Sequence, residues 1–182
     1  SKVAFIGLGA MGYPMAGHLQ NNGYNVTVYN RTTIKAEKWV EEYKGSMAKT
    51  PGEASQKSEI VFMCVGRDED IIEVMEGEGG ILSNVAEGSI IVDHTTASAE
   101  IARNYYQKLK DKKLSFLDAP VSGGQAGAEN GVLSIMIGGD EKDYNTVKPV
   151  LTSYGKAVEL IGPSGSGQIA KMINQICIAG LV

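Results

Sequence analysis

The chain has 182 residues, which is enough for one complete domain and part of another. Its 17 basic and 21 acidic residues leave a net charge of −4, so the overall charge provides no attraction to nucleic acid or to an anionic membrane. The 23 glycines are scattered without a period, which excludes a collagen-like chain, and no apolar stretch is long enough to span a membrane.

Apolar runs alternate with amphipathic stretches from the start of the chain. The uniformly apolar run 3–7 is typical of a buried parallel strand, and a helix over 10–22 and a strand over 26–30 complete a unit of βαβ length. Thr50 before Pro51 predicts the N-cap and first residue of a short helix. Further strands are predicted at 46–48, 59–65, 89–95, 114–120, 132–139 and 156–162, and further helices at 33–43, 98–110 and 141–151. This order predicts an α/β fold with a doubly wound, mostly parallel Rossmann-type sheet, helices on both faces, and room for an antiparallel strand near its end.

The tail of the chain has a different character. A turn over 163–167 leads into a helix that starts at Gln168 and runs to the end. Its apolar residues lie around most of its circumference: Ile169, Ile173, Ile176, Cys177, Leu181 and Val182. Such a helix belongs inside a larger structure, so we expect either that the chain is part of a longer protein or that the helix packs against another subunit. We expect residues 1–162 to form one domain, with 163–182 as a turn and the start of a long interdomain helix.

The two cysteines, Cys64 and Cys177, each lie inside an apolar run. This placement predicts two buried, reduced thiols in a cytoplasmic protein, and the cysteine spacing does not suggest a metal site.

The turn after the first strand carries a glycine motif. Gly7-Leu8-Gly9-Ala10-Met11-Gly12 matches G-x-G-x-x-G, and it follows a strand and opens a helix, as a dinucleotide-binding loop does. In such a loop the first glycine permits the tight turn, the second lets a pyrophosphate approach, and the third lets helix and strand pack closely. The helix N-terminus then offers free N–H groups and a favourable dipole to the phosphates.

The end of the second strand indicates which dinucleotide is bound. NAD-binding domains usually place a carboxylate there, but this chain has Asn30-Arg31-Thr32. Arg31 would pair with a ribose 2′-phosphate and Thr32 would donate a hydroxyl, which favours NADP(H) over NAD(H). The alternative is that Arg31 is a solvated turn residue.

Several motifs together resemble one family. The opening GLGAMGYPMAGHL, the strand ending NRT, and the segments at 118–139 (DAPVSGGQAGAENGVLSIMIGG) and 165–175 (GSGQIAKMINQ) resemble the β-hydroxyacid dehydrogenases. This family includes 3-hydroxyisobutyrate dehydrogenases, tartronate semialdehyde reductases and glyoxylate/succinic semialdehyde reductases. The resemblance implies hydride transfer between NADP(H) and a small 3-hydroxy acid or semialdehyde acid. It also implies a C-terminal helical domain that this chain lacks, and a homo-oligomer for the full-length protein.

The resemblance also implies roles for residues before the tail. Ser122, Gly123 and Gly124 would hold the substrate carboxylate, although without the resemblance this segment would be interpreted as a plain loop. Thr96 would lie near the nicotinamide ribose, and Val65 would belong to the loop that covers the cofactor. We expect structural roles for the other polar residues near these strand ends, which are Asp93, His94 and Asp118.

Lys171 is the cation of the apolar tail helix. Asn174 and Gln175 follow it at i+3 and i+4 and so share its face, and Gly167 lies one turn earlier, where it would admit a ligand. By resemblance Lys171 is the catalytic acid–base group, and Asn174 and Gln175 bind substrate; by itself it could equally be a solvated lysine at a helix start. Many relatives have Asn at the position of Gln175, which leaves the substrate open.

Two rival functions compete with this interpretation. One is an imine reductase of the same superfamily, and the other is a cofactor-binding module without catalysis. Relatives of both kinds generally replace the lysine, so Lys171 and the intact Ser122-Gly123-Gly124 segment disfavour both.

Overall fold

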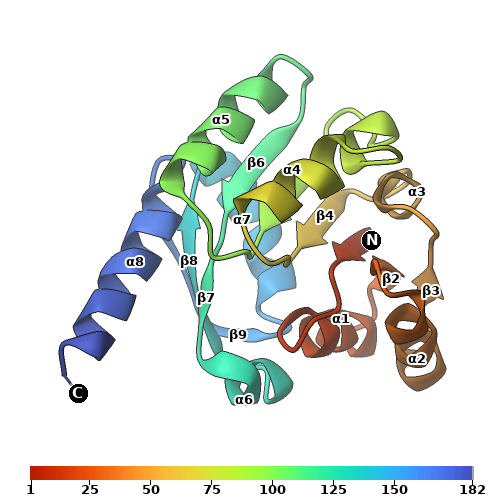
Figure 1. The fold of residues 1–182 in the computed structure, drawn as a ribbon, viewed down its shortest axis with the longest axis horizontal. Helices are drawn as coiled ribbons and strands as arrows, with labels where there is room; N and C mark the ends of the chain where they lie inside the picture. The colour runs from red at the N-terminus through yellow and green to blue at the C-terminus, as the bar shows by residue number, and fades with distance from the viewer. Residues whose placement is uncertain (182) are drawn as a thin grey trace.

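A nine-stranded sheet forms the centre of the computed structural model, which describes residues 1–181. The strands are β1 (Lys2–Ile6), β2 (Asn25–Tyr29), β3 (Ser46–Met47), β4 (Ile60–Met63), β5 (Ile90–Asp93), β6 (Ser115–Asp118), β7 (Val121–Ser122), β8 (Leu133–Gly138) and β9 (Gly155–Gly162). They are ordered β3-β2-β1-β4-β5-β6-β8-β7, and β9 pairs with β8 (Figure 1). The strands from β1 to β6 pair in parallel, β8 runs antiparallel to β6 and β7, and β9 is parallel to β8. The predicted doubly wound α/β fold is therefore confirmed.

Helices cover both faces of the sheet. They are α1 (Gly12–Asn21), α2 (Thr33–Tyr43), α3 (Pro51–Ser55), α4 (Asp68–Glu76), the 3₁₀ helix η1 (Ile81–Ser83), α5 (Ala99–Lys110), α6 (Gly124–Glu129), α7 (Glu141–Leu151) and α8 (Ser166–Ala179). Side chains of α1, α2, α6 and α7 join one buried cluster, and side chains of α3, α4 and α5 join a second one. Strand β1 supplies both clusters in alternation, with Val3 and Phe5 on one face and Ala4 and Ile6 on the other. Its continuous apolar run therefore reflects burial on both faces.

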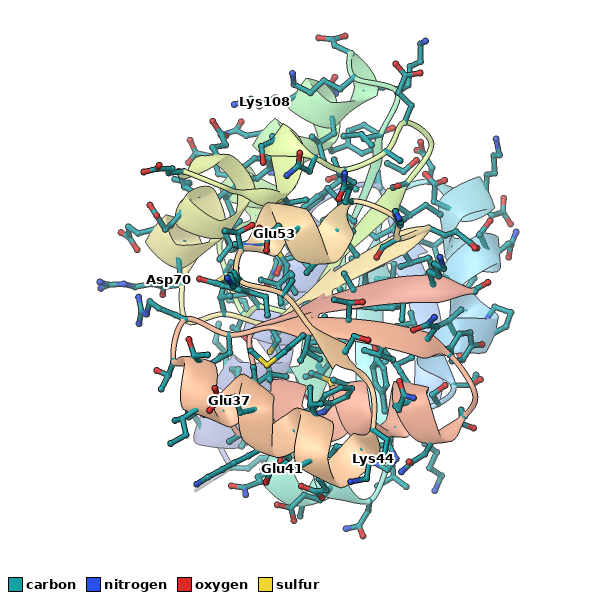
Figure 2. All side chains as sticks on the ribbon, turned by 90° about the vertical axis from the view of Figure 1, so that its right-hand side faces the viewer. Glu37, Glu41, Lys44, Glu53, Asp70 and Lys108 are labelled. Carbon is teal, nitrogen blue, oxygen red and sulfur yellow. The ribbon has the colours of Figure 1, made fainter. Side chains whose placement is uncertain are left out.

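The charged side chains of the surface helix α2 lie on the outside of these layers. Glu37 and Glu41 project from α2 into solvent (Figure 2). Trp39 of the same helix is fully buried and belongs to the core cluster on that face of the sheet. Helix α2 is thus amphipathic in the usual sense of a surface helix.

The predicted elements are present, with ends that differ by a few residues. The helices expected at 33–43 and 141–151 have those bounds, and Thr50 Oγ1 accepts a hydrogen bond from the Glu53 amide at 3.1 Å, as an N-cap does. Four further elements were not predicted: α4, η1, β7 and α6. The strand β7 has only two residues and α6 has six glycine- and alanine-rich residues, so neither carries a periodic apolar pattern.

Helix α8 packs along β8 and β9 and against α5, and it begins at Ser166, two residues before the predicted start. Its sheet-facing side buries Gly167, Gln168 and Lys171. Its large apolar side chains from Met172 onward are exposed: Met172, Ile173, Ile176 and Ile178, with Leu181 just beyond its end. Within residues 1–181, no helix is both long and apolar enough to cross a membrane.

Two details of the tail correct the sequence-based expectations. Cys177 lies on the exposed side of α8 and is not buried, because the apolar residues there outnumber those that the sheet can cover. Gly167 does not face an open ligand site. A Cβ at this position would overlap the Met136 carbonyl and come within 2.8 Å of an Asp118 carboxylate oxygen, so the glycine allows α8 to approach the sheet.

Candidate functional site

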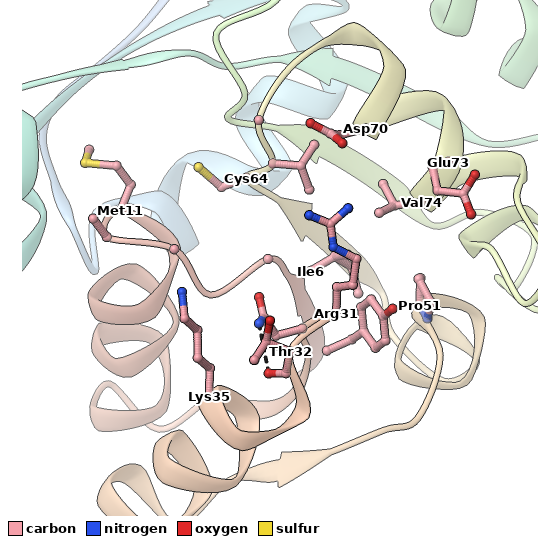
Figure 3. Close-up of a pocket in the computed structure, with 18 of the residues that line it drawn as sticks. Ile6, Met11, Arg31, Thr32, Lys35, Pro51, Cys64, Asp70, Glu73 and Val74 are labelled. Atoms are coloured by element: carbon pink, nitrogen blue, oxygen red, sulfur yellow. Dashed lines mark hydrogen bonds between the residues drawn. The ribbon is translucent and has the colours of Figure 1, made fainter.

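A pocket of about 510 Å³ lies at the carboxyl ends of β1, β2 and β4 (Figure 3). Its floor includes the glycine loop, since Gly7, Gly9, Ala10, Met11 and Gly12 all line it. This is the edge of an open parallel sheet at which ligands usually bind. Leu8 is the member of the predicted loop that does not line the pocket, because its side chain is buried in the core.

The three motif glycines have three different surroundings. Gly7 has a φ of +97°, and a Cβ there would overlap the Cys64 carbonyl, so the tight turn needs glycine. A Cβ at Gly12 would overlap the Gly7 carbonyl, so this glycine lets α1 pack closely on the loop. A Cβ at Gly9 would have nothing within 4 Å of it, which leaves open space over the N-terminus of α1. This space is where a pyrophosphate would meet backbone N–H groups and the helix dipole.

Asn30 holds the loop in place. Its Oδ1 accepts a hydrogen bond from the Leu8 amide at 2.8 Å, and its Nδ2 donates to the Thr32 carbonyl at 3.0 Å. The side chain is therefore committed to the two turns that frame the pocket, and Leu8 has no free amide for a ligand. Asn30 also lines the pocket, whereas Leu8 contributes only through the shape of the loop.

One wall of the pocket is cationic and the opposite wall is acidic. Arg31 and Thr32 line it as predicted, and Lys35 from the first turn of α2 joins them with its ammonium directed into the pocket (Figure 3). Across the pocket, α4 and the segment after it contribute three carboxylates that the sequence pattern did not assign to the site: Asp70, Glu73 and Glu78. Arg31 lies before the start of α2, so helical spacing does not relate it to Lys35, and only the folded pocket brings the two cations together.

A second group of predicted residues meets at α8. Lys171 is only 8% exposed, and burial lowers the pKa of its ammonium below the ordinary value. Most of the lysine side chain is therefore covered by the sheet, which disfavours the alternative of a fully solvated lysine. One turn further, Asn174 Nδ2 donates to Ser122 Oγ at 3.3 Å, which joins the α8 face to β7. Gln175 is exposed and does not enter this group.

The segment after Ser122 turns on two glycines. Gly123 has a φ of 132° and Gly124 a φ of 63°, both in the region that favours glycine. Together they redirect the backbone from β7 into α6 beside the Ser122 hydroxyl. Because Ser122 Oγ accepts the Asn174 hydrogen bond, its own hydroxyl hydrogen is free for another acceptor.

A buried set of hydrogen bonds lies between the pocket and α8. Thr95 Oγ1 accepts from the amide of Val65, which lines the pocket, at 3.0 Å. The Thr95 amide donates to Asp93 Oδ1 at 2.9 Å, and its carbonyl accepts from Gln168 Nε2 of α8 at 2.7 Å. Thr96, the predicted neighbour of the cofactor, is exposed and does not line the pocket. Thr95 and Gln168 were missed because only the folded sheet brings them together.

His94 and Asp118 have structural roles, as predicted. His94 Nδ1 lies 2.6 Å from the Ala119 carbonyl, which only accepts, so Nδ1 carries the proton and Nε2 accepts from the Tyr154 hydroxyl at 2.7 Å. Burial lowers the pKa of His94 to about 4, which keeps the ring neutral. Asp118 accepts hydrogen bonds from the amides of Gly165 and Gln168 at the start of α8.

The thiol of Cys64 lines the pocket and is half-buried, which agrees in part with the predicted burial. Burial of its sulfur raises the pKa of Cys64 to about 12, and the nearby Asp93 carboxylate contributes. The thiol is therefore protonated and unreactive under ordinary conditions.

Over residues 2–162 the chain matches the family described as the NAD binding domain of 6-phosphogluconate dehydrogenase. The chain belongs to this family. A site for a nicotinamide dinucleotide is therefore expected.

Named relatives agree with the family resemblance that the motifs carry. An uncharacterised oxidoreductase of Shewanella frigidimarina is 58% identical over 182 residues, which are all of this chain and 62% of the relative. The 2-hydroxy-3-oxopropionate reductase of Escherichia coli is 36% identical over 178 residues, or 98% of this chain and 60% of the relative. The 3-hydroxyisobutyrate dehydrogenase of Mycobacterium tuberculosis, solved with L-serine, superposes with a TM-score of 0.92 at 28% identity and covers 98% of this chain and 60% of that one. The chain thus spans about 60% of the length of these relatives.

Two glycine substitutions in this NAD-binding domain separate packing from ligand binding. Gly12→Ala should destabilise the fold by about 1–3 kcal/mol, because the methyl overlaps the Gly7 carbonyl. Gly9→Ala should leave stability unchanged or slightly higher, because nothing lies within 4 Å, yet weaken dinucleotide binding at least about tenfold. Thermal unfolding and calorimetric titration with the dinucleotide measure the two effects. A Gly9→Ala variant that binds as tightly as the wild type would contradict the placement of the phosphates.

Asp93 should make stability depend on pH. Burial raises its pKa to about 7, so between about pH 4 and 7 the folded chain keeps a proton that the unfolded chain has lost. The folded-state pKa is the higher one, so the stability that the protonated Asp93 contributes is fully present below about pH 4 and is lost as the pH rises through 7. Asp93→Asn, which stays neutral and keeps an acceptor for the Thr95 amide, should gain about 1–3 kcal/mol relative to the wild type between pH 5 and pH 8. Denaturant unfolding of both proteins at pH 5 and pH 8 checks this. If the stability difference between variant and wild type is the same at both pH values, Asp93 is already ionised at pH 5.

Proposed function

We propose that the full-length protein is an oxidoreductase that transfers a hydride between NADP(H) and a small 3-hydroxy acid or semialdehyde acid, with Lys171 as its catalytic acid–base group. The observation that carries this proposal is the buried Lys171 on the sheet side of α8, one turn from the Asn174–Ser122 hydrogen bond. A buried lysine with a lowered pKa is suited to proton transfer. The names of the relatives support the oxidoreductase class, since two of those compared act on hydroxy or oxo acids by their names.

The preference for NADP(H) rests on the cationic wall of the pocket. Arg31 and Lys35 both line it, Thr32 adds a hydroxyl, and no carboxylate stands at the end of β2. A 2′-phosphate would pair with the two cations, and the Arg31 guanidinium would also stack on adenine. The residues present therefore fit the phosphorylated dinucleotide, which when bound supplies the hydride.

Five residues of this chain would handle the substrate directly. The Ser122 hydroxyl and the backbone at Gly123 and Gly124 would bind its carboxylate, and Asn174 would orient Ser122. The Lys171 ammonium would donate its proton to the carbonyl oxygen during reduction, and the neutral amine would take the hydroxyl proton in the reverse direction. Gln175, which is exposed, is proposed to reach the substrate only through a group outside this chain.

The domain organisation belongs to the same proposal. We assign residues 1–162 to the cofactor domain and 163–182 to a turn and the start of a helix that leads to a C-terminal helical domain. A homo-oligomeric state and a cytoplasmic location stay predictions. The relatives are longer than this chain, so catalysis is assigned to the full-length protein.

A panel of substrates tests the proposed reaction. We expect the full-length protein to oxidise NADPH with at least one of glyoxylate, succinic semialdehyde, 2-hydroxy-3-oxopropionate and methylmalonate semialdehyde. Absorbance of the reduced nicotinamide measures the rate. Tight NADPH binding with no turnover on the whole panel would instead favour a cofactor-binding module without catalysis.

The cationic wall predicts a cofactor preference of at least tenfold for NADPH over NADH, about 1.4 kcal/mol. Arg31→Ala and Lys35→Ala should each weaken NADPH binding more than NADH binding, because NADH has no 2′-phosphate to pair with them and keeps only the adenine contact of Arg31. Lys38→Ala on the exposed side of α2 is the matched control and should alter neither affinity. Calorimetry with both cofactors decides, and equal affinities in the wild type would refute the preference.

Lys171→Ala in the full-length protein should lower kcat by a factor of roughly 10² to 10⁴ while NADPH affinity stays close to the wild-type value. Because burial lowers the pKa of Lys171, reduction by the wild type should slow as the pH rises through a midpoint below the ordinary lysine value. Steady-state rates between pH 6 and 10 measure both effects. If the variant retains more than about a tenth of kcat, another group donates the proton.

A further inference from the structure

Gln168 is a buried polar residue that neither the glycine motif nor the proposed proton transfer uses. Its side chain is only 3% exposed and lies on the sheet-facing side of α8, three residues before Lys171. At this spacing the two residues occupy the same side of the helix. A fixed Gln168 side chain therefore fixes the turn of α8 that carries Lys171.

The amide of Gln168 is bound at both of its ends by one short loop. Its Nε2 donates to the Thr95 carbonyl at 2.7 Å, and its Oε1 accepts from the Ala97 amide at 3.1 Å. The two backbone partners have opposite hydrogen-bonding roles, so they permit only one orientation of the amide. Removing the side-chain amide would leave both backbone groups without a partner, in a place where water is largely excluded.

The same loop is hydrogen-bonded to the cofactor pocket. Thr95 Oγ1 accepts from the amide of Val65, and Val65 lines the pocket. On its other side, α8 is held by the Asp118 carboxylate through the amides of Gly165 and Gln168 at 2.8 and 3.0 Å. Gln168 is thus the side chain through which the helix of Lys171 is joined to the loop beside the dinucleotide.

We propose that Gln168 is a positioning residue that sets the placement of Lys171 relative to the cofactor pocket. The inference rests on the proposed function, because it assigns Gln168 an effect on the reaction that Lys171 serves. It predicts an effect on kcat that exceeds the effect on folding. Small displacements of an acid–base group are known to reduce rates strongly, because the group must stay within hydrogen-bond reach of the reacting oxygen.

The test uses Gln168→Met in the full-length protein, since methionine keeps nearly the same length and volume but makes neither hydrogen bond. Ser89→Ala is the matched control: Ser89 is 3% exposed and donates to the Ser58 carbonyl at 2.9 Å, away from the site. We expect Gln168→Met to lower kcat about 10- to 100-fold with less than a threefold change in the KM for NADPH. Ser89→Ala should lose comparable stability and keep its kcat.

A double variant separates positioning from a general loss of structure. In a Lys171→Ala background, Gln168→Met should cause no further loss of kcat, because the group that it positions is absent. An equal loss in both backgrounds, or an unchanged kcat in the single variant, would overturn the inference. Gln168→Glu, which can accept from Ala97 but sets a second acceptor against the Thr95 carbonyl when ionised, should not restore the rate.

A second measurement keeps the inference distinct from the proposed function. If the wild type binds NADPH but turns over none of the panel, the proposed function fails. The link between the cofactor pocket and α8 is then measured by amide hydrogen exchange. NADPH should slow exchange over residues 166–171 in the wild type and not in Gln168→Met. No slowing in the wild type, or the same slowing in both proteins, would overturn the role of Gln168.

Discussion

The buried carboxylate of Asp118 fixes the position of α8, and the arrangement of the second half of the site depends on it. Asp118 is fully buried at the end of β6 and accepts hydrogen bonds from the amides of Gly165 and Gln168. The positive end of the helix dipole and these N–H groups offset the cost of burying the charge. Two glycines make room for the Asp118 carboxylate. A Cβ on Gly138 would lie 2.6 Å from one of its oxygens, and a Cβ on Gly167 would lie 2.8 Å from the other. Helix and sheet consequently meet at backbone distance, which brings the first turn of α8, and with it Lys171, down onto the sheet.

Residue spacing predicted those parts of the fold and the site that depend on local geometry. The glycine loop, the N-cap at Thr50 and the alternation of strands and helices each follow from neighbouring residues, and each was found close to its predicted place. The contact between Ser122 and Asn174 joins residues 52 positions apart, and it needs β7 to lie beside α8. Spacing carries no information on such a pairing, and β7 itself is too short to be recognised. The family resemblance, and not the pattern of residues, supplied that part of the site.

The two walls of the pocket explain why the overall charge of the chain is a poor guide to its ligand. Three carboxylates, Asp70, Glu73 and Glu78, face two cations, Arg31 and Lys35, so the lining has no excess of positive charge. A phosphate bound there is held by individual donors and by the start of α1 rather than by a diffuse field. The missed helix α4 matters for this reason, because it contributes Asp70 and Glu73 to the acidic wall.

The two cysteines differ in a way that bears on how the molecule could be studied. The sulfur of Cys64 keeps its proton, since burial raises its pKa to about 12, whereas Cys177 stands exposed on α8. Thiol-directed reagents attack the thiolate and need access, so a maleimide dye would attach selectively at Cys177. Among residues 1–181, Cys177 is thus the exposed thiol, and it lies on the helix that carries Lys171. A fluorophore or spin label attached there in this 182-residue chain would report on the motion of that helix.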